Sequence, residues 1–290
     1  MVPLGLGSSL SRASVVLSAS LILDKYTGAV AAYSLRSLKS GVTSVVKVRR
    51  SNDDAHADFT ASEITDGTLT TWTGSNDGFV NTLYDQSGNG NHGVVASDAL
   101  EPKLVNSGSV LTSGNSSKPA FHFDGSNDFI PLGTFSDALN INNLSSFAVF
   151  EPDDVSSDES QILMLGGSAG GNKRWFFKTK SGNLEFSYAG TGNPIADFNT
   201  TANNDQNLVS MIAGSTLGGF RPFLNGTALG SGSVSVVSNS NDSTDASLGG
   251  QGGSGVWAFD GLMSEIIVYG SDQSANRTEI EGNITDYYGI

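Results

Sequence analysis

The chain has 290 residues, of which 38% are hydrophobic and only 15% are charged. Lys and Arg number 15 against 29 Asp and Glu, and the resulting formal charge of −14 repels phosphate backbones and anionic lipid headgroups. We therefore expect neither nucleic acid nor a membrane as a partner. The chain has no cysteine, which excludes a disulfide framework, a thiolate zinc site and a cysteine nucleophile.

The start of the chain is rich in Gly and Ser and lacks hydrophobic periodicity. We predict that residues 1–27 form an N-terminal arm and that residues 28–290 form one domain. An extended arm buries little of its own surface, so we expect its apolar side chains to dock on another subunit. These side chains belong to Leu4, Leu6, Leu10, Val15, Val16 and Leu17.

The segment 29–38, AVAAYSLRSL, places Ala31, Leu35 and Leu38 at helical spacing and predicts a short helix. After it, short runs of β-branched and aromatic residues alternate with Gly, Asn, Asp and Ser, which favour tight turns. The predicted strands are 42–50, 79–84, 120–123, 129–132, 146–151, 161–165, 174–179, 184–188, 208–213, 220–224, 234–237, 256–259 and 263–269.

Residues 271–290 predict a C-terminal helix, because apolar residues recur at i, i+4, i+7 and i+8 from Ile280. Ser271 or Asp272 is suited to cap its start, and Gly289 stands where a helix-ending glycine belongs. The predicted fold is therefore all-β: a two-sheet antiparallel jelly-roll sandwich with a short N-terminal helix and a C-terminal helix.

The stretch LYDQSGNGNHG, residues 83–93, has two interpretations. We expect no cofactor in this chain, with Ca²⁺ as the alternative, because Asp85, Asn89 and Asn91 can offer it oxygen ligands. Alternatively, these side chains bind backbone N–H groups of a tight turn, with glycines at positive φ. We favour the turn.

Other polar residues also have a functional and a structural interpretation. Asp124 and Asp128, in FDGSNDF, either contact a cation or reverse the chain between two strands, and we favour the reversal. The three histidines lie far apart in the sequence and match no zinc motif.

The three tryptophans, Trp72, Trp175 and Trp257, are the candidate platforms for stacking against sugar rings. In RWFFK, strand alternation places Trp175 and Phe177 on one face, which is typical of a core. Trp257 follows a glycine-rich segment, and we expect it to be the most exposed of the three.

Three blocks carry a resemblance to a known family: AAYSLRSLKSG, KVRRSNDDAHADF and LYDQSGNGNHG, in that order. They resemble the front half of the catalytic domain of fungal-type α-L-arabinofuranosidase B, which is a concanavalin A/laminin-G-like β-sandwich. FHFDGSNDFIPLG, SSFAVFEPD and residues 261–290 resemble the laminin-G-like jelly roll of many adhesive and virion proteins. GLGSSLSR is similar to the opening of small bacteriophage virion proteins. The resemblance covers residues 29–290.

The resemblance does not carry a catalytic residue onto this chain. A retaining arabinofuranosidase requires two carboxyl groups about 5 Å apart. The family's catalytic acid follows a Gly-Gly pair, and at that position this chain has Gln251, whose amide cannot donate a catalytic proton. The family's adjacent cysteine pair is also absent. We therefore assign no catalytic residue from the sequence.

Our main hypothesis is a non-enzymatic virion structural protein of a bacteriophage, displayed on the capsid or tail surface. Its expected partners are other virion proteins and further copies of the chain, with a host-surface glycan as an additional candidate. The alternatives are a secreted glycoside hydrolase of the α-L-arabinofuranosidase type and a carbohydrate-binding module. The expected location is the virion surface or, under the alternatives, the extracellular space.

Overall fold

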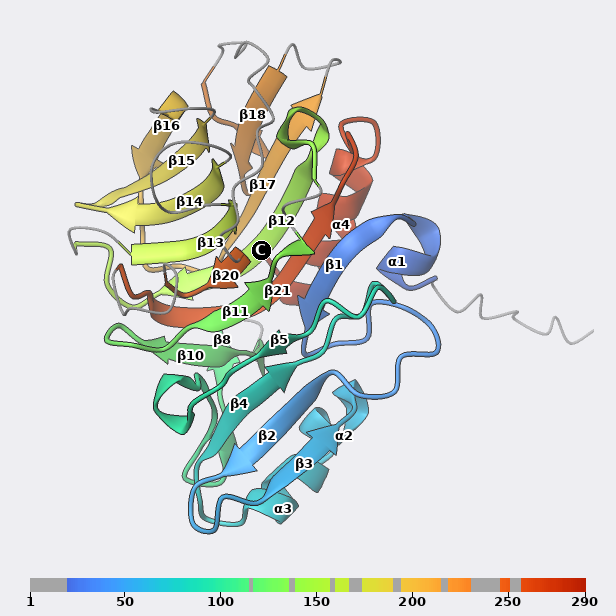
Figure 1. The fold of residues 1–290 in the computed structure, drawn as a ribbon, viewed down its shortest axis with the longest axis vertical. Helices are drawn as coiled ribbons and strands as arrows, with labels where there is room; N and C mark the ends of the chain where they lie inside the picture. Colours follow the sequence, from blue (N-terminus) through green and yellow to red (C-terminus); the bar gives the residue numbers. More distant parts are fainter. Residues whose placement is uncertain are drawn as a thin grey trace, which may run out of the picture.

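The computed structural model describes residues 20–114, 117–135, 139–156, 160–166, 174–189, 194–214, 219–230, 246–250 and 257–290. Two antiparallel sheets make up most of the fold (Figure 1). Neighbouring strands of the larger sheet follow the order β19 (Thr227–Ala228), β18 (Gly219–Leu224), β17 (Asn207–Gly214), β12 (Ser145–Pro152), β21 (Asp260–Tyr269), β10 (Phe121–Asp124), β6 (Lys103–Asn106), β4 (Gly78–Leu83), β2 (Val46–Arg50) and β3 (His56–Phe59).

Three shorter pairings extend the larger sheet: β1 (Ala29–Ser34) with β21, β5 (Gly93–Val94) with β4, and β7 (Ser109–Val110) with β6. The smaller sheet has the order β11 (Ile130–Gly133), β20 (Ala246–Leu248), β13 (Ser160–Gly166), β14 (Arg174–Lys180), β15 (Asn183–Ala189) and β16 (Pro194–Thr201). A separate pair joins β8 (Thr112–Ser113) to β9 (Lys118–Pro119).

Helices are few and short, as the composition predicts. The α-helices are α1 (Ile22–Lys25), α2 (Ala61–Thr65), α3 (Thr68–Thr73) and α4 (Arg277–Tyr288). The 3-10 turns include η1 (Asp98–Leu100) and η3 (Ile141–Asn143). Among the described residues, no helix has the length and apolar content needed to cross a bilayer.

The main core lies between the two sheets and joins them into a sandwich. Phe150 of β12 packs on Phe177 of β14, with ring centroids 5.6 Å apart, and Phe177 stacks on Phe186 of β15. All three rings are fully buried. Because each strand alternates its side chains between two faces, this pattern fixes which face of each sheet points inward. The predicted all-β sandwich is confirmed.

The outer face of the larger sheet is covered by α4, which lies behind β21 and β12 in Figure 1. Ile280 and Ile284 of this helix are buried in a second cluster with Phe147 of β12 and Ile267 of β21. The C-terminal helix is therefore confirmed. Gly289 ends it at a φ of 73°, a left-handed conformation that glycine adopts without steric cost.

A buried polar network anchors α4 to the sheet. The Arg36 guanidinium donates to both carboxylate oxygens of Glu265, from Nε at 2.6 Å and from Nη2 at 2.8 Å. The Ser34 hydroxyl, 3.0 Å away, and the Tyr288 hydroxyl, 3.3 Å away, also donate to Glu265. A planar bidentate pair fixes orientation as well as charge, so this network sets the position of the helix on β1 and β21.

The start of the domain differs from the prediction. Residues 29–34 form a strand, β1, paired with β21, instead of a helix. Tyr33 is buried in the core between the sheets, and Ala32 is buried in the cluster under α4. Burial on both faces explains the continuous apolar run, and pairing with β21 outweighs a helical spacing that rests on three residues.

Part of the predicted arm also packs on its own domain. Ile22, Leu23 and Tyr26 are buried in the cluster under α4, so these residues belong to the sandwich. The six apolar arm residues, from Leu4 to Leu17, lie outside the described residues, as does the predicted strand 234–237. The predicted strand 256–259 is wrong over its described part, because Trp257 lies in a turn and β21 begins only at Asp260.

Candidate functional site

The 83–93 loop is built as a turn fixed to the neighbouring strand β1. The Asp85 carboxylate accepts four hydrogen bonds: from a β1 backbone N–H, from the Ser87 N–H and hydroxyl, and from the Asn91 N–H. Asn89 and Asn91 point their amide nitrogens to the carbonyl of Val30, at 3.1 and 2.8 Å. This is the arrangement that the turn interpretation predicts. A calcium ion at this loop stays a prediction.

Of the three tryptophans, Trp175 is not a surface platform. Its side chain is 0% exposed, its ring packs edge-on against Phe220, and Nε1 donates to the Ser146 hydroxyl at 2.8 Å. The sugar-binding assignment of Trp175 is therefore wrong, because strand alternation turns this side chain into the core with Phe177.

Trp72 and Trp257 are both partly exposed. Trp72 packs edge-on against Phe59 and lies under the Arg50 guanidinium, 4.8 Å from the ring centroid. Trp257 has a φ of 59°, a backbone conformation that bulky residues rarely adopt, and its ring lies 5.2 Å from the Lys178 ammonium. Sugar stacking on these two rings stays a prediction.

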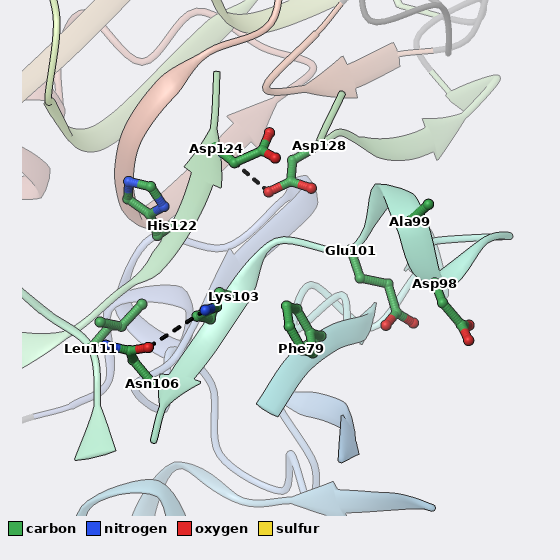
Figure 2. Close-up of a pocket in the computed structure, with 10 residues that line it drawn as sticks. All are labelled: Phe79, Asp98, Ala99, Glu101, Lys103, Asn106, Leu111, His122, Asp124 and Asp128. Atoms are coloured by element: carbon green, nitrogen blue, oxygen red, sulfur yellow. Dashed lines mark hydrogen bonds between the residues drawn. The ribbon is translucent and has the colours of Figure 1, made fainter. Parts of the chain in front are cut away.

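A different site lies on the outer face of the larger sheet, away from α4. Cross-strand pairing places Phe79 beside Lys103, Lys103 beside His122, and His122 beside Leu262. These strands form the floor of a cavity of about 640 Å³. It is lined by Phe79, Asp98, Ala99, Glu101, Lys103, Asn106, Leu111, His122, Asp124 and Asp128 (Figure 2).

The turn after β10 supplies two carboxyl groups to this cavity, on the same side as His122 in Figure 2. Asp124 accepts the N–H groups of Ser126 and Asn127 at 2.9 and 3.2 Å, and Asp128 accepts the Asp124 N–H at 3.1 Å. Both carboxyls thus stabilise the chain reversal that FDGSNDF predicts. Burial, reinforced by the negative charge of Asp124, raises the pKa of Asp128 to about 7.

His122 brings two further carboxylates to the same region. Its Nε2 lies 2.8 Å from Asp153 Oδ2, at the end of β12, and 3.8 Å from Asp260 Oδ1, at the start of β21. Burial and the neighbouring Asp153 charge raise the pKa of Asp260. One ring nitrogen of His122 and one carboxylate oxygen each of Asp153 and Asp260 all lie within 4.8 Å of one another. No local pattern in the sequence indicates this grouping, because only the sheet order makes β10, β21 and β12 neighbours.

The opposite side of the cavity carries charges that are already paired. Glu101 binds Arg49 Nε at 2.6 Å, and Lys103 binds Asp77 at 2.9 Å. Phe79 lies between these two cations, which are 4.9 and 5.6 Å from its ring centroid. The cavity therefore combines a wall whose charges are paired with a wall formed by His122, Asp124 and Asp128 (Figure 2).

The raised pKa of Asp128 predicts a pH-dependent cost in stability. The unfolded carboxyl titrates near 3.8 and the folded one near 7, so the folded chain holds this proton more tightly and stability falls as the pH rises between these values. Asp128→Asn cannot ionise and keeps an oxygen for the Asp124 N–H. We expect it to be more stable than wild type by about 1–3 kcal/mol at pH 8, allowing for solvent screening, and similar to wild type at pH 4.

Urea unfolding of both proteins at the two pH values measures this difference. Asp286→Asn is the matched control, because it makes the same chemical change at an exposed position of α4. A difference between Asp128→Asn and wild type that is the same at pH 4 and pH 8 would contradict the raised pKa.

Comparison with known proteins gives matches in structure but not in sequence. Neither the models of known protein families nor the sequences of curated proteins match this chain. An arabinofuranosidase complexed with arabinofuranosyl-α-1,2-xylobiose matches with a TM-score of 0.67 at 14% identity. A GH54 α-L-arabinofuranosidase soaked with a cyclic sulfate inhibitor matches with a TM-score of 0.66 at 16% identity. Both matches cover 92% of this chain, which spans 64% of the length of each enzyme.

These matches confirm an arabinofuranosidase-like β-sandwich and correct our main hypothesis. The predicted non-enzymatic bacteriophage virion protein is contradicted, because the two structures named above, which match 92% of the chain, are glycoside hydrolases. The prediction that the chain is not an enzyme is contradicted by the same finding. The sequence identity is low enough that the likeness establishes the fold alone.

Proposed function

We propose that this chain is a glycoside hydrolase that binds its substrate in the cavity beside β10. The observation that carries the proposal is the Asp128 carboxyl, which lines the cavity and has its pKa raised to about 7. A carboxylic acid that stays protonated near neutral pH is what a general acid requires, and a second carboxyl nearby is the usual companion in glycoside hydrolysis. Asp124 is that companion.

In the proposed reaction, Asp128 donates its proton to the glycosidic oxygen as the bond to the anomeric carbon breaks. The departing alcohol carries this proton away, and positive charge develops on the sugar ring. The Asp124 carboxylate stabilises that charge. Water then adds its oxygen to the anomeric carbon and gives up a proton to the Asp128 carboxylate, which restores the starting state of the site. The fold of the matching enzymes supports an arabinofuranoside as the first substrate to test.

The test measures release of nitrophenol from 4-nitrophenyl α-L-arabinofuranoside and from a panel of other nitrophenyl glycosides. On a substrate with a sugar leaving group, such as arabinoxylan, we expect Asp128→Asn to lower kcat by about 10²–10⁴-fold, the range for loss of a general acid. The loss should be smaller on substrates with a better leaving group, since these need less protonation. Asp286→Asn is expected to keep full activity.

Two outcomes would overturn this assignment. An Asp128→Asn variant that keeps wild-type kcat on every cleaved substrate would remove Asp128 from the reaction. Absence of turnover on the whole panel, and on arabinoxylan, would contradict hydrolysis itself.

A second candidate is carbohydrate binding without hydrolysis. It is supported by Gln251, which stands where the resemblance places a catalytic acid and which lies outside the described residues. It is also supported by the left-handed backbone of Trp257, since such conformations are often kept at ligand contacts. Glycan binding by wild type with no turnover of the bound glycan would favour this candidate over the hydrolase.

A further inference from the structure

The charges that line the cavity do not balance. The lining includes four carboxyls, Asp98, Glu101, Asp124 and Asp128, but only one ammonium, that of Lys103. The cations nearby already have partners, because Lys103 binds Asp77, and Arg49 binds Glu101 and approaches Asp98 at 3.6 Å. Across the part of the chain that the structure describes, no Lys or Arg forms an ion pair with Asp124 or Asp128. The Asp124 carboxylate therefore has no cationic partner among these residues, and Asp128, whose pKa is raised to about 7, adds a second negative charge only in its ionised form.

The neighbouring strand ends increase this imbalance. Asp260 lies directly against the Asp124–Asp128 turn, since a Cβ placed on Gly125 would be 2.9 Å from the Asp260 Cβ. Asp260 and Asp153 share the single imidazole of His122. Two aspartates of the turn therefore line the cavity, and Asp153 and Asp260, at the ends of two strands, lie near them. Burial raises the pKa of both Asp128 and Asp260, and the negative charges of Asp124 and Asp153 raise these pKa values further.

We propose that this cavity selects glycans that carry protonated amino groups over neutral glycans and over uronic acids. The inference rests on the proposed function in that a saccharide occupies the cavity. An ammonium group on a sugar has three N–H donors and a positive charge. Asp124, together with Asp128 in its ionised form, offers carboxylate acceptors among the residues that line the cavity. A uronic acid would place a further carboxylate beside these groups and be repelled.

The test compares three tetrasaccharides by isothermal titration of the full chain at pH 7 in EDTA: the β-1,4 glucosamine tetramer, its N-acetylated form and tetragalacturonate. The glucosamine tetramer and its N-acetylated form share the same sugar backbone and differ in charge. A free amine comparable to an α-amino group has a pKa of about 7.7–8.0, so the glucosamine amines are mostly protonated at pH 7. We expect the glucosamine tetramer to bind at least about fivefold more tightly than the N-acetylated one at low salt. This preference should shrink at 0.5 M salt, and tetragalacturonate should bind weakest.

The matched variant is Asp260→Asn, which removes one charge beside the turn without changing the proposed catalytic pair. It is expected to lose at least half of the preference and to keep its affinity for the N-acetylated tetramer. Asp286→Asn should keep the full preference. Equal binding of the amino and N-acetylated forms would overturn the inference, and so would an amino preference that Asp260→Asn leaves unchanged.

The outcomes also separate this inference from the proposed function. Turnover of a neutral glycoside without any amino preference would leave the hydrolase standing and refute the charge selection. A preference for the amino glycan without turnover of any glycoside would support the charge selection and refute the hydrolase. Saturable binding of Ca²⁺ in the absence of EDTA, combined with no response to the sugar's amino group, would show that the surplus charge serves a metal ion instead.

Discussion

Replacing Arg36 with methionine is expected to destabilise the chain by about 3–5 kcal/mol. The Glu265 carboxylate is only 1% exposed and the Arg36 side chain 13%, so both charges sit largely out of water. Removing the guanidinium leaves the Glu265 carboxyl buried without a cation, with only hydroxyl donors around it. The cost comes from that uncompensated charge more than from the lost attraction. Urea unfolding at pH 7 measures the change.

Two controls identify the cause. Arg36→Met combined with Glu265→Gln removes both charges, and this double variant should regain at least about 1 kcal/mol relative to Arg36→Met alone. Lys25→Met breaks an exposed ion pair with Glu279 and should hardly change the urea midpoint. If Arg36→Met behaves like Lys25→Met, the network does not hold α4 on the sheet.

Trp175→Ala is expected to cost about 3–5 kcal/mol, the range for removing a buried aromatic side chain. The ring lies in the core between the sheets, and its removal leaves a cavity beside Phe220. The substitution also removes the donor that satisfies the Ser146 hydroxyl, which is itself buried. Thermal or urea unfolding tests this expectation.

Comparison with two other variants separates the core role from a ligand role. Trp175→Phe keeps most of the ring and should cost less than Trp175→Ala, with the unsatisfied Ser146 hydroxyl as the main loss. Trp257→Ala removes a partly exposed ring and should cost much less still. If Trp175→Ala lowers glycan affinity while leaving stability unchanged, the assignment of this residue to the core is wrong.

Much of the sheet architecture is readable from the sequence because strands and tight turns leave local signals. The predicted strand 146–151 lies within β12, and 174–179 lies within β14. Strand 29–34 is the main failure, because a run buried on both faces has no alternation to show. Short pieces such as β8 carry too few residues for any periodicity.

The site was less predictable than the fold. The sequence pointed to Asp124 and Asp128 as either a cation contact or a turn, and the structure shows the turn together with a cavity. No sequence signal linked His122 to Asp153 or Asp260, which are 31 and 138 residues away by their numbering. That proximity depends on which strands are neighbours.

The sequence by itself determined the fold class, the C-terminal helix and the two reversals at 83–93 and 123–129. Each depends on residues close together in the chain, where spacing, turn chemistry and capping act directly. Only the tertiary structure decided the strand order of the larger sheet, and with it the cavity and its surplus of negative charge. The physical reason is that strand pairing depends on burial summed over both sheets. No short stretch of sequence contains enough information to predict that sum.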